Sequence, residues 1–99
     1  MAFEVIWAHS AIADLEQVVR YIAAEDVDAA QRPGLTLIGR IEQTAEFPSK
    51  GRIVPEKGED NLREIIVTPD RIVYEISHGD QTIQVPRVWH SARGAIPLR

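Results

Sequence analysis

A histidine and several arginines in the second half of the chain are of the residue types that RNA cleavage requires. An imidazole ordinarily titrates near neutrality, so His90 is a candidate general acid or base. Attack by a 2′-hydroxyl also needs cations that hold the charge developing on the phosphorane. The candidate cations are Arg63, Arg87 and Arg93. The competing interpretation of His90 is a histidine at a strand end that forms only local hydrogen bonds.

The individual arginines have structural interpretations as well. Arg63 is either a phosphate ligand or the cross-strand partner of Glu75. Arg93 follows the last predicted strand and has no obvious ion-pair partner nearby in sequence. We therefore favour Arg93 as the basic residue that contacts a target.

Arg71 and two glutamates complete the charged candidates. Arg71 either anchors a protein partner or pairs with Asp70 or Asp80, and the ion pair is favoured. Glu56 and Glu64 are the acidic candidates for an acid–base role. Glu56 is expected to balance basic neighbours in its loop. Glu64 is expected at a sheet edge or paired with a helix residue.

Metal and cofactor chemistry have little support in the sequence. The chain has three histidines and no cysteine, and the histidines lack metal-ligand spacing. We predict no metal site and no cofactor. Trp7 and Trp89 are expected to pack in the core rather than to stack on bases.

The elements that must position these residues follow from periodicity. Residues 3–8 alternate and predict a strand, and Ser10 is a suitable N-cap for a helix that starts at Ala11. In that helix we expect Asp14 on the solvated side. The apolar stripe expected in it consists of Leu15, Val18, Val19 and Ile22.

A second helix is less regular. Pro33-Gly34 near its start predicts that it either begins near Pro33 or kinks there, and Asp28 is a candidate cap. Its expected stripe is Leu35, Ile38, Ile41 and Ala45. Strands are predicted at 62–67, 71–76 and 82–90, with a short one at 52–54. The order β-α-α-β-β-β indicates an α+β fold, a helical hairpin packed on a mostly antiparallel sheet of four or five strands.

Strand pairing leads to a prediction of the faces. A three-residue turn at 68–70 would pair Val67 with Arg71, Arg63 with Glu75 and Glu64 with Tyr74. The predicted core face carries Leu62, Ile66, Ile72, Tyr74 and Ile76. The other face exposes Ile65, Val67 and Val73 between charges, and exposed apolar surface of this kind marks interaction sites.

The last strand leaves one alternative open. A Gly79-Asp80 turn would pair Ile76 with Ile83. Strict alternation would then bury Arg87 and expose His90. A bulge near Pro86 would shift the register by one step and reverse this.

Composition limits the classes of function. The 99 residues predict one domain spanning 1–99, and no apolar run approaches the length of a membrane span. The absence of cysteine and of a signal-peptide pattern favours the cytoplasm. The net charge is −4, and the first half is far more acidic than the second, so general binding of nucleic acid is disfavoured.

The order of several segments resembles a known family. "DLEQVVRYIAAED", "AEFPSKGR", "LRE", "RIVYEI" and "VWHSARG" resemble, over nearly the whole chain, the ParE/RelE superfamily of toxins from bacterial type II toxin–antitoxin systems. Departures are Pro33-Gly34 and Pro86. The resemblance implies a small toxin that binds a cognate antitoxin, in which case an antitoxin segment is expected to cover the face of Ile65, Val67 and Val73 or the adjacent sheet edge, by strand addition or as a helix in a groove.

Two target classes are implied by this resemblance. RelE-like members cleave mRNA on the ribosome, and His90, Arg63 and Arg87 would be catalytic only in that case. ParE-like members inhibit DNA gyrase, and Arg93 and Arg71 would then contact the target or partner. The chain has only two lysines and no aromatic residue after Trp89, so it lacks the basic and aromatic catalytic set common in RelE-like members. We predict gyrase inhibition, with mRNA cleavage as the alternative and a non-toxic antitoxin binder as a third class.

Overall fold

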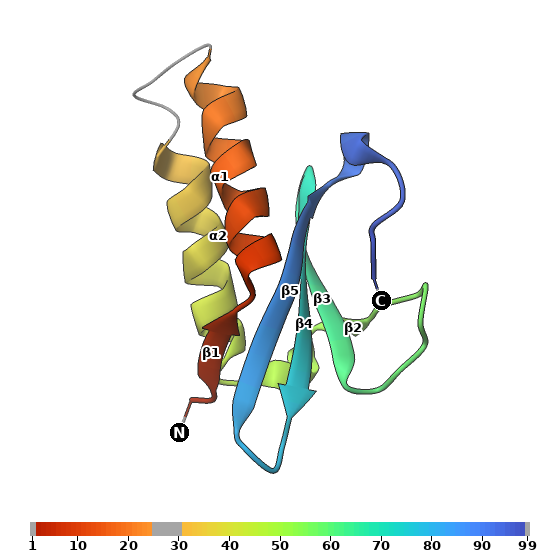
Figure 1. Ribbon diagram of the computed structural model, residues 1–99. Coiled ribbons are helices and arrows are strands. Elements are labelled where there is room, and N and C mark those ends of the chain that lie inside the picture. The colour runs from red at the N-terminus through yellow and green to blue at the C-terminus, as the bar shows by residue number, and fades with distance from the viewer. Residues whose placement is uncertain (1, 25–30, 99) are drawn as a thin grey trace.

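The computed structural model describes residues 2–24 and 31–98, in which a helical hairpin precedes most of a sheet (Figure 1). The strands are β1 Glu4–Trp7, β2 Arg52–Ile53, β3 Leu62–Val67, β4 Asp70–Ser77 and β5 Thr82–His90. The helices are α1 His9–Ala23 and α2 Gln31–Thr44, with short 3-10 helices η1 Pro48–Lys50 and η2 Ser91–Arg93. Within these ranges no helix is long and apolar enough to cross a membrane.

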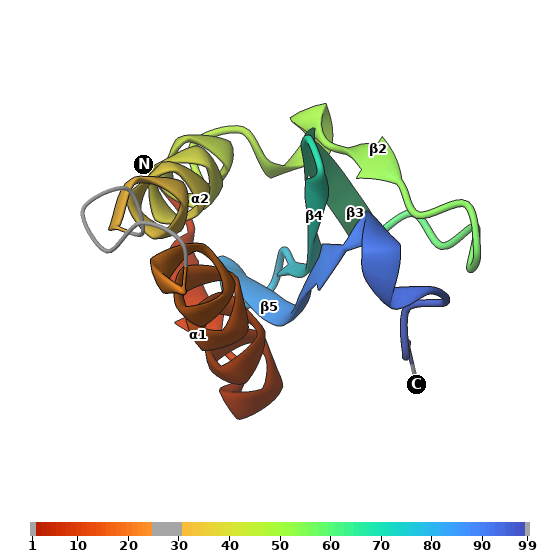
Figure 2. The same cartoon turned by 90° about the horizontal axis from the view of Figure 1, so that it is seen from above.

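The strands form one mixed sheet in the order β1-β5-β4-β3-β2. β1 is parallel to β5, and the other three pairs are antiparallel. Both helices lie on the same side of the sheet (Figure 1, Figure 2). The predicted α+β fold, a helical hairpin on a mostly antiparallel sheet, is confirmed.

The start of α1 differs from the prediction. The N-cap is Ala8, whose backbone is extended, and Ser10 already lies inside the helix. The Ser10 hydroxyl donates to the carbonyl oxygen of Pro86 at 2.7 Å instead of capping its own helix. Ser10 therefore connects α1 to β5, and the predicted cap is wrong.

α2 begins at Gln31, which places Pro33 in the first turn, where a missing N–H costs no hydrogen bond. The expected cap at Asp28 lies outside the described residues. Leu35 is 67% exposed, so its assignment to the apolar stripe is wrong, whereas Ile41 and Ala45 are buried as expected. Leu37 takes the buried position one turn before Ile41.

The β3–β4 connection has two residues rather than three. Val67 pairs with Asp70, Arg63 with Tyr74 and Glu64 with Val73. A shift of one residue turns a strand over, because side chains alternate between faces. Ile65 and Val67 therefore pack toward the helices, while the predicted core face of β4 is correct. The predicted core face of β3 is wrong: Ile66 is 43% exposed and Leu62 joins a cluster on the opposite side of the sheet.

A register shift in the β4–β5 pair decides the alternative at Pro86. Ile76 pairs with Ile83 as predicted, but Val73 pairs with Arg87, which leaves one more residue on β5 than on β4. Because of this bulge, the side chain of Val88 points into the apolar core between the helices and the sheet, where Val88 is 1% exposed. Because of the bulge, the side chains of Val85 and Val88 lie on the side of β5 that faces the helices, and that of Arg87 does not.

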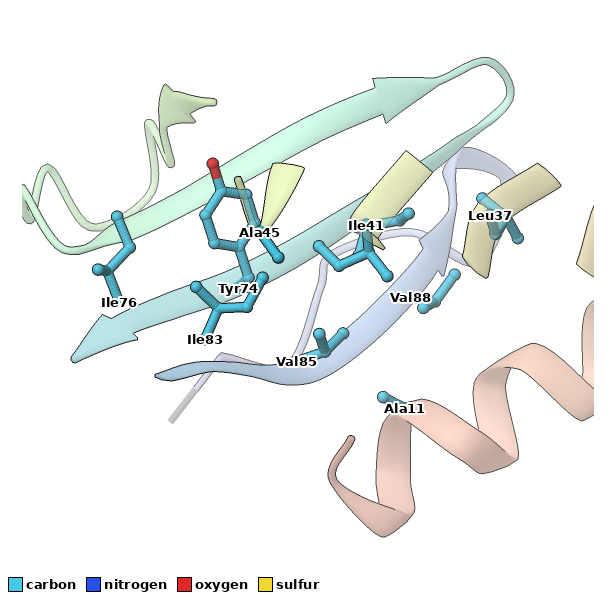
Figure 3. Close-up of a cluster of buried hydrophobic side chains, with 10 residues drawn as sticks. Ala11, Leu37, Ile41, Ala45, Tyr74, Ile76, Ile83, Val85 and Val88 are labelled. Carbon is cyan, nitrogen blue, oxygen red and sulfur yellow. The ribbon is translucent and has the colours of Figure 1, made fainter. Parts of the chain in front are cut away.

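Buried apolar side chains form two groups. The larger group lies between helices and sheet, and Trp7 packs against it; Figure 3 labels Ala11, Leu37, Ile41, Ala45, Tyr74, Ile76, Ile83, Val85 and Val88. The smaller group consists of Val54, Leu62 and Val73, against which Ile96 and Leu98 of the C-terminal tail pack. The tail therefore covers part of the sheet face that the helices leave open.

Candidate functional site

A buried carboxylate of α1 joins this helix to the end of β5. Asp14 is 3% exposed. Arg87 binds it with two parallel hydrogen bonds, Nε to Oδ2 at 2.9 Å and Nη2 to Oδ1 at 2.7 Å. The backbone N–H of Val88 donates to Oδ2 at 3.0 Å, and Nη1 of Arg93 donates to Oδ1 at 3.0 Å. The prediction that Asp14 is solvated is wrong.

The same two arginines cover Trp89. The guanidinium of Arg93 lies 4.0 Å from the centroid of the Trp89 ring, and that of Arg87 lies 4.9 Å from it. The indole N–H of Trp89 donates to the carbonyl oxygen of Gly94 at 2.9 Å. Trp89 is buried, as predicted, and Arg93 has a partner that the sequence did not indicate.

A cleft opens beside this cluster, between the helical hairpin and the far end of the sheet. α1 and β5 diverge toward the top of Figure 1. The cleft has a volume of about 840 Å³ and is lined by the second half of α1, part of α2, the β3–β4 connection and the end of β5. Val18, Leu37 and Val67 contribute apolar walls, and Tyr21, which is 76% exposed, lies at the cleft. This size is within the range of ligand and peptide pockets.

His90 and Asp70 face each other across the strand pair at this cleft. The Nδ1 atom of His90 accepts a hydrogen bond from the backbone N–H of Ala92 at 3.0 Å, so Nε2 carries the ring proton. Burial raises the pKa of Asp70, an effect that His90 opposes. His90 therefore forms a local hydrogen bond, as expected for a histidine at a strand end, and it also lines the cleft.

Comparisons with known proteins identify the family of this chain. The family described as "ParE toxin of type II toxin-antitoxin system, parDE" matches residues 5–94. The chain belongs to this ParE toxin family. It is 33% identical over 91 residues to Toxin RelE2 of Caulobacter vibrioides, a match that covers 91% of this chain and 97% of the relative.

Solved structures share the fold of this ParE-family toxin. A chain of the chromosomal ParDE toxin–antitoxin system of P. aeruginosa superposes with a TM-score of 0.74 at 14% identity, covering 90% of this chain and 96% of the other. A chain of the RelBE2 toxin–antitoxin complex of Mycobacterium tuberculosis gives 0.62 at 19% identity, covering 91% and 99%. These likenesses confirm the fold of the toxin.

On the open face of the sheet, the toxin holds a network of alternating charges. Glu64 is 1% exposed and accepts from Nε of Arg52 and from Nη1 of Arg71, the latter at 2.7 Å. Arg71 also binds Glu56, and this hydrogen bond lowers the pKa of Glu56. The expected pairing of Arg71 with Asp70 or Asp80 is replaced by these two glutamates. Glu64 pairs with arginines of the sheet rather than with a helix residue.

Arg63 supports a loop. It lies opposite Tyr74, so alternation separates it from Glu75, and the predicted cross-strand pair is wrong. Its guanidinium donates to the backbone carbonyl oxygens of Asp60 at 2.6 Å, Gly51 at 3.0 Å and Ser49 at 3.3 Å. These bonds hold the segment before β2 against β3.

The predicted docking face does not exist as one surface. Val73 is fully buried in the smaller cluster, whereas Ile65 and Val67 face the helices. The physical reason is the register shift in β3, which places these residues on opposite sides of the sheet. Of the three, Val67 reaches the cleft.

Among residues 2–24 and 31–98, no group of three metal-ligating side chains comes together.

Sequence reasoning missed Asp14, Asp70 and Tyr21 as site residues. A signal for Asp14 was present, because Ala11, Asp14, Leu15 and Val18 follow the i, i+3, i+4, i+7 spacing of a single helix face. A carboxylate on a buried face requires a cation, and arginines were available in the last strand. Asp70 and Tyr21 carried no comparable signal, since their setting depends on the turn and on the divergence of α1 from β5.

Proposed function

We propose that this toxin inhibits DNA gyrase through protein–protein contacts, and that a cognate antitoxin neutralises it by docking in the cleft. The main support for gyrase inhibition is that the candidate basic residues are already bound to other groups of the chain. The guanidinium groups of four candidate arginines bind groups of the chain itself: Arg63, Arg71, Arg87 and Arg93. They would have to leave carboxylates or carbonyl oxygens to bind phosphates. This favours a protein target over an RNA substrate.

The state of His90 supports the same proposal. A general base needs a free lone pair on a ring nitrogen, and the lone pair of Nδ1 already accepts from Ala92. Proton abstraction by His90 would require this bond to break. Inhibition by binding requires no such step.

The experiment that tests the target compares two assays on the same proteins. Wild type is expected to inhibit supercoiling by purified gyrase and to leave mRNA in a translating extract without specific cuts. Arg93→Ala is expected to weaken inhibition by up to about thirty-fold, the effect of an interface hot spot, because 35% of the Arg93 side chain stays exposed to a protein surface while Asp14 holds its guanidinium in place. His90→Ala should remain within a few-fold of wild type. Arg40→Ala, which removes an exposed arginine of α2, is the control and should match wild type.

The alternative is a ribosome-dependent mRNA endonuclease. The relative named RelE2, at 33% identity, is the observation that favours it. In that case mRNA is cut at defined codon positions, and His90→Ala reduces the cleavage rate by about 10²–10⁴-fold without abolishing ribosome binding. Such cuts, together with unaffected supercoiling, would replace the first proposal by this one.

The character of the cleft supports the antitoxin part of the proposal. Its walls combine apolar side chains of both helices with the β3–β4 turn, which suits an amphipathic helix laid in a groove. The exposed ring of Tyr21 lies at this groove, and aromatic residues of this kind act as anchors at interfaces. This location replaces the docking face predicted from the sequence.

Tyr21→Ala is expected to weaken antitoxin binding by about thirty-fold or more without lowering stability, because the ring is exposed in the free toxin. The measurement is calorimetric titration with the protein encoded by the adjacent reading frame. Phe47→Ala is the matched control, since Phe47 is 61% exposed but lies outside the cleft. Equal losses for the two variants would contradict docking in the cleft.

A further inference from the structure

A buried carboxylate oxygen at the cleft lacks a hydrogen-bond partner. Asp70 is the first residue of β4 and alternates with Ile72, which packs under the helices. Only 8% of Asp70 is exposed. Among the buried side-chain oxygens and nitrogens of residues 2–24 and 31–98, its Oδ1 is the one atom without a partner. An unsatisfied polar atom of this kind destabilises the free fold.

The cations near Asp70 are held by other groups. Arg93 and Arg20 line the same cleft, but Arg93 binds Asp14 and Arg20 binds Glu16. His90 lies opposite Asp70, and its Nδ1 accepts a backbone N–H. The carboxylate of Asp70 therefore borders an apolar cleft without a bound cation among the described residues.

Filling the cleft would remove Asp70 from its remaining contact with water. A purely apolar occupant would leave the charge buried and unpaired, or would force Asp70 to take up a proton. A lysine or arginine side chain supplies both the missing donor and the opposite charge. The net charge of −4 also attracts a basic segment.

Building on the proposed antitoxin docking, we infer that the face of the antitoxin segment that enters this cleft is apolar except for one lysine or arginine, which pairs with Asp70. Asp70 then acts as the determinant that selects the cognate segment, because an apolar segment without a cation would bury an unpaired charge. Its unsatisfied state in the free toxin is relieved in the complex.

The test uses Asp70→Asn, which keeps the shape of the side chain and removes its charge. Its affinity for the protein encoded by the adjacent reading frame, the candidate antitoxin, is expected to fall by about thirty-fold or more, as for truncation of a buried charge pair. Replacing the pairing lysine or arginine of the antitoxin by methionine should cause a similar loss, and combining both changes should add little. Glu46→Gln, which removes a charge from an exposed side chain outside the cleft, is the control and should bind as wild type.

The free toxin provides an independent readout. Asp70→Asn removes a buried, unpaired charge, so its Tm should lie about 4–8 °C above that of wild type. This shift is typical of a small gain in the free energy of unfolding for a domain of this size. If Asp70 had a purely structural role, Asp70→Asn would lower the Tm instead. Higher stability together with weaker antitoxin binding would show that Asp70 contributes to recognition at a cost in stability.

The pH dependence separates a cation from an apolar occupant. Protonated Asp70 cannot pair with a cation, so wild-type affinity should fall as the pH is lowered from 7.5 toward the raised pKa of Asp70. An apolar occupant would instead bind more tightly at lower pH. Subtracting the profile of Asp70→Asn removes the contributions of the other titratable groups at the cleft, which are His90, Arg93, Arg20, Tyr21 and Asp14.

The outcomes are distinguishable. Equal binding of wild type and Asp70→Asn, tighter binding at lower pH, or a lower Tm for Asp70→Asn would overturn this inference and leave the proposed function standing. If the wild-type toxin does not bind the antitoxin, and co-expression does not relieve growth arrest, the proposed function fails and the inference fails with it.

Discussion

Asp14→Ala is expected to lower the free energy of unfolding by about 3–5 kcal/mol, because it leaves the partners of a buried ion pair uncompensated. Asp14 accepts hydrogen bonds from Arg87, Arg93 and the backbone of Val88, so three groups lose an acceptor at once. Domains of this size are stable by only about 5–15 kcal/mol. Urea unfolding followed by circular dichroism measures the change.

The matched control lies two residues further along the same helix. Glu16 is also an acidic residue of α1, but its side chain is 57% exposed and pairs with Arg20 at 3.3 Å on the surface. Glu16→Ala should cost no more than about 0.5 kcal/mol, as for other exposed pairs four residues apart. Similar costs for the two substitutions would contradict the assignment of Asp14 as the residue that ties α1 to β5.

Tyr74→Ala is expected to lower the free energy of unfolding by about 3–5 kcal/mol, the range found for truncation of buried aromatic side chains. Tyr74 is 0% exposed and lies in the larger core (Figure 3). Its hydroxyl donates to the carbonyl oxygen of Pro48 and accepts from the backbone N–H of Gly51 at 3.1 Å. The substitution therefore removes core volume and releases the segment that leads into β2. Thermal and urea unfolding report the loss.

Two further variants separate these contributions. Tyr74→Phe keeps the ring and should cost about 1–3 kcal/mol for the two buried backbone groups left unpaired. Tyr21→Ala removes a ring of the same type that is 76% exposed, and should change stability by less than about 0.5 kcal/mol. A loss below about 1 kcal/mol for Tyr74→Ala would contradict the placement of Tyr74 in the core.

The sequence by itself was sufficient for the type and order of the main elements. The β-branched runs in residues 62–67 and 71–76 and the stripe of Leu15, Val18 and Ile22 are local patterns, and each identifies its element without knowledge of its neighbours. The faces of β4 were also correct, since Ile72, Tyr74 and Ile76 outnumber any apolar set on the other side.

The faces of β3 could not be decided locally. Ile65, Val67, Ile66 and Leu62 make both sides of this strand apolar, so pattern alone does not separate them. The two-residue connection at Thr68-Pro69 sets the register, and a difference of one residue in that turn moves every side chain of β3 to the other side. The predicted docking surface failed for this reason.

What the sequence determined, then, is a ParE/RelE-type α+β chain with its basic residues concentrated in the second half. The tertiary structure decided which carboxylates those arginines bind, because Asp14 meets Arg87 across 73 residues and Arg93 across 79. It also decided that Oδ1 of Asp70 lacks a hydrogen-bond partner within residues 2–24 and 31–98, while Asp14 has three partners. Charge pairing in a buried site depends on which side chains the fold brings within about 3 Å of one another, and neither composition nor periodicity contains that distance.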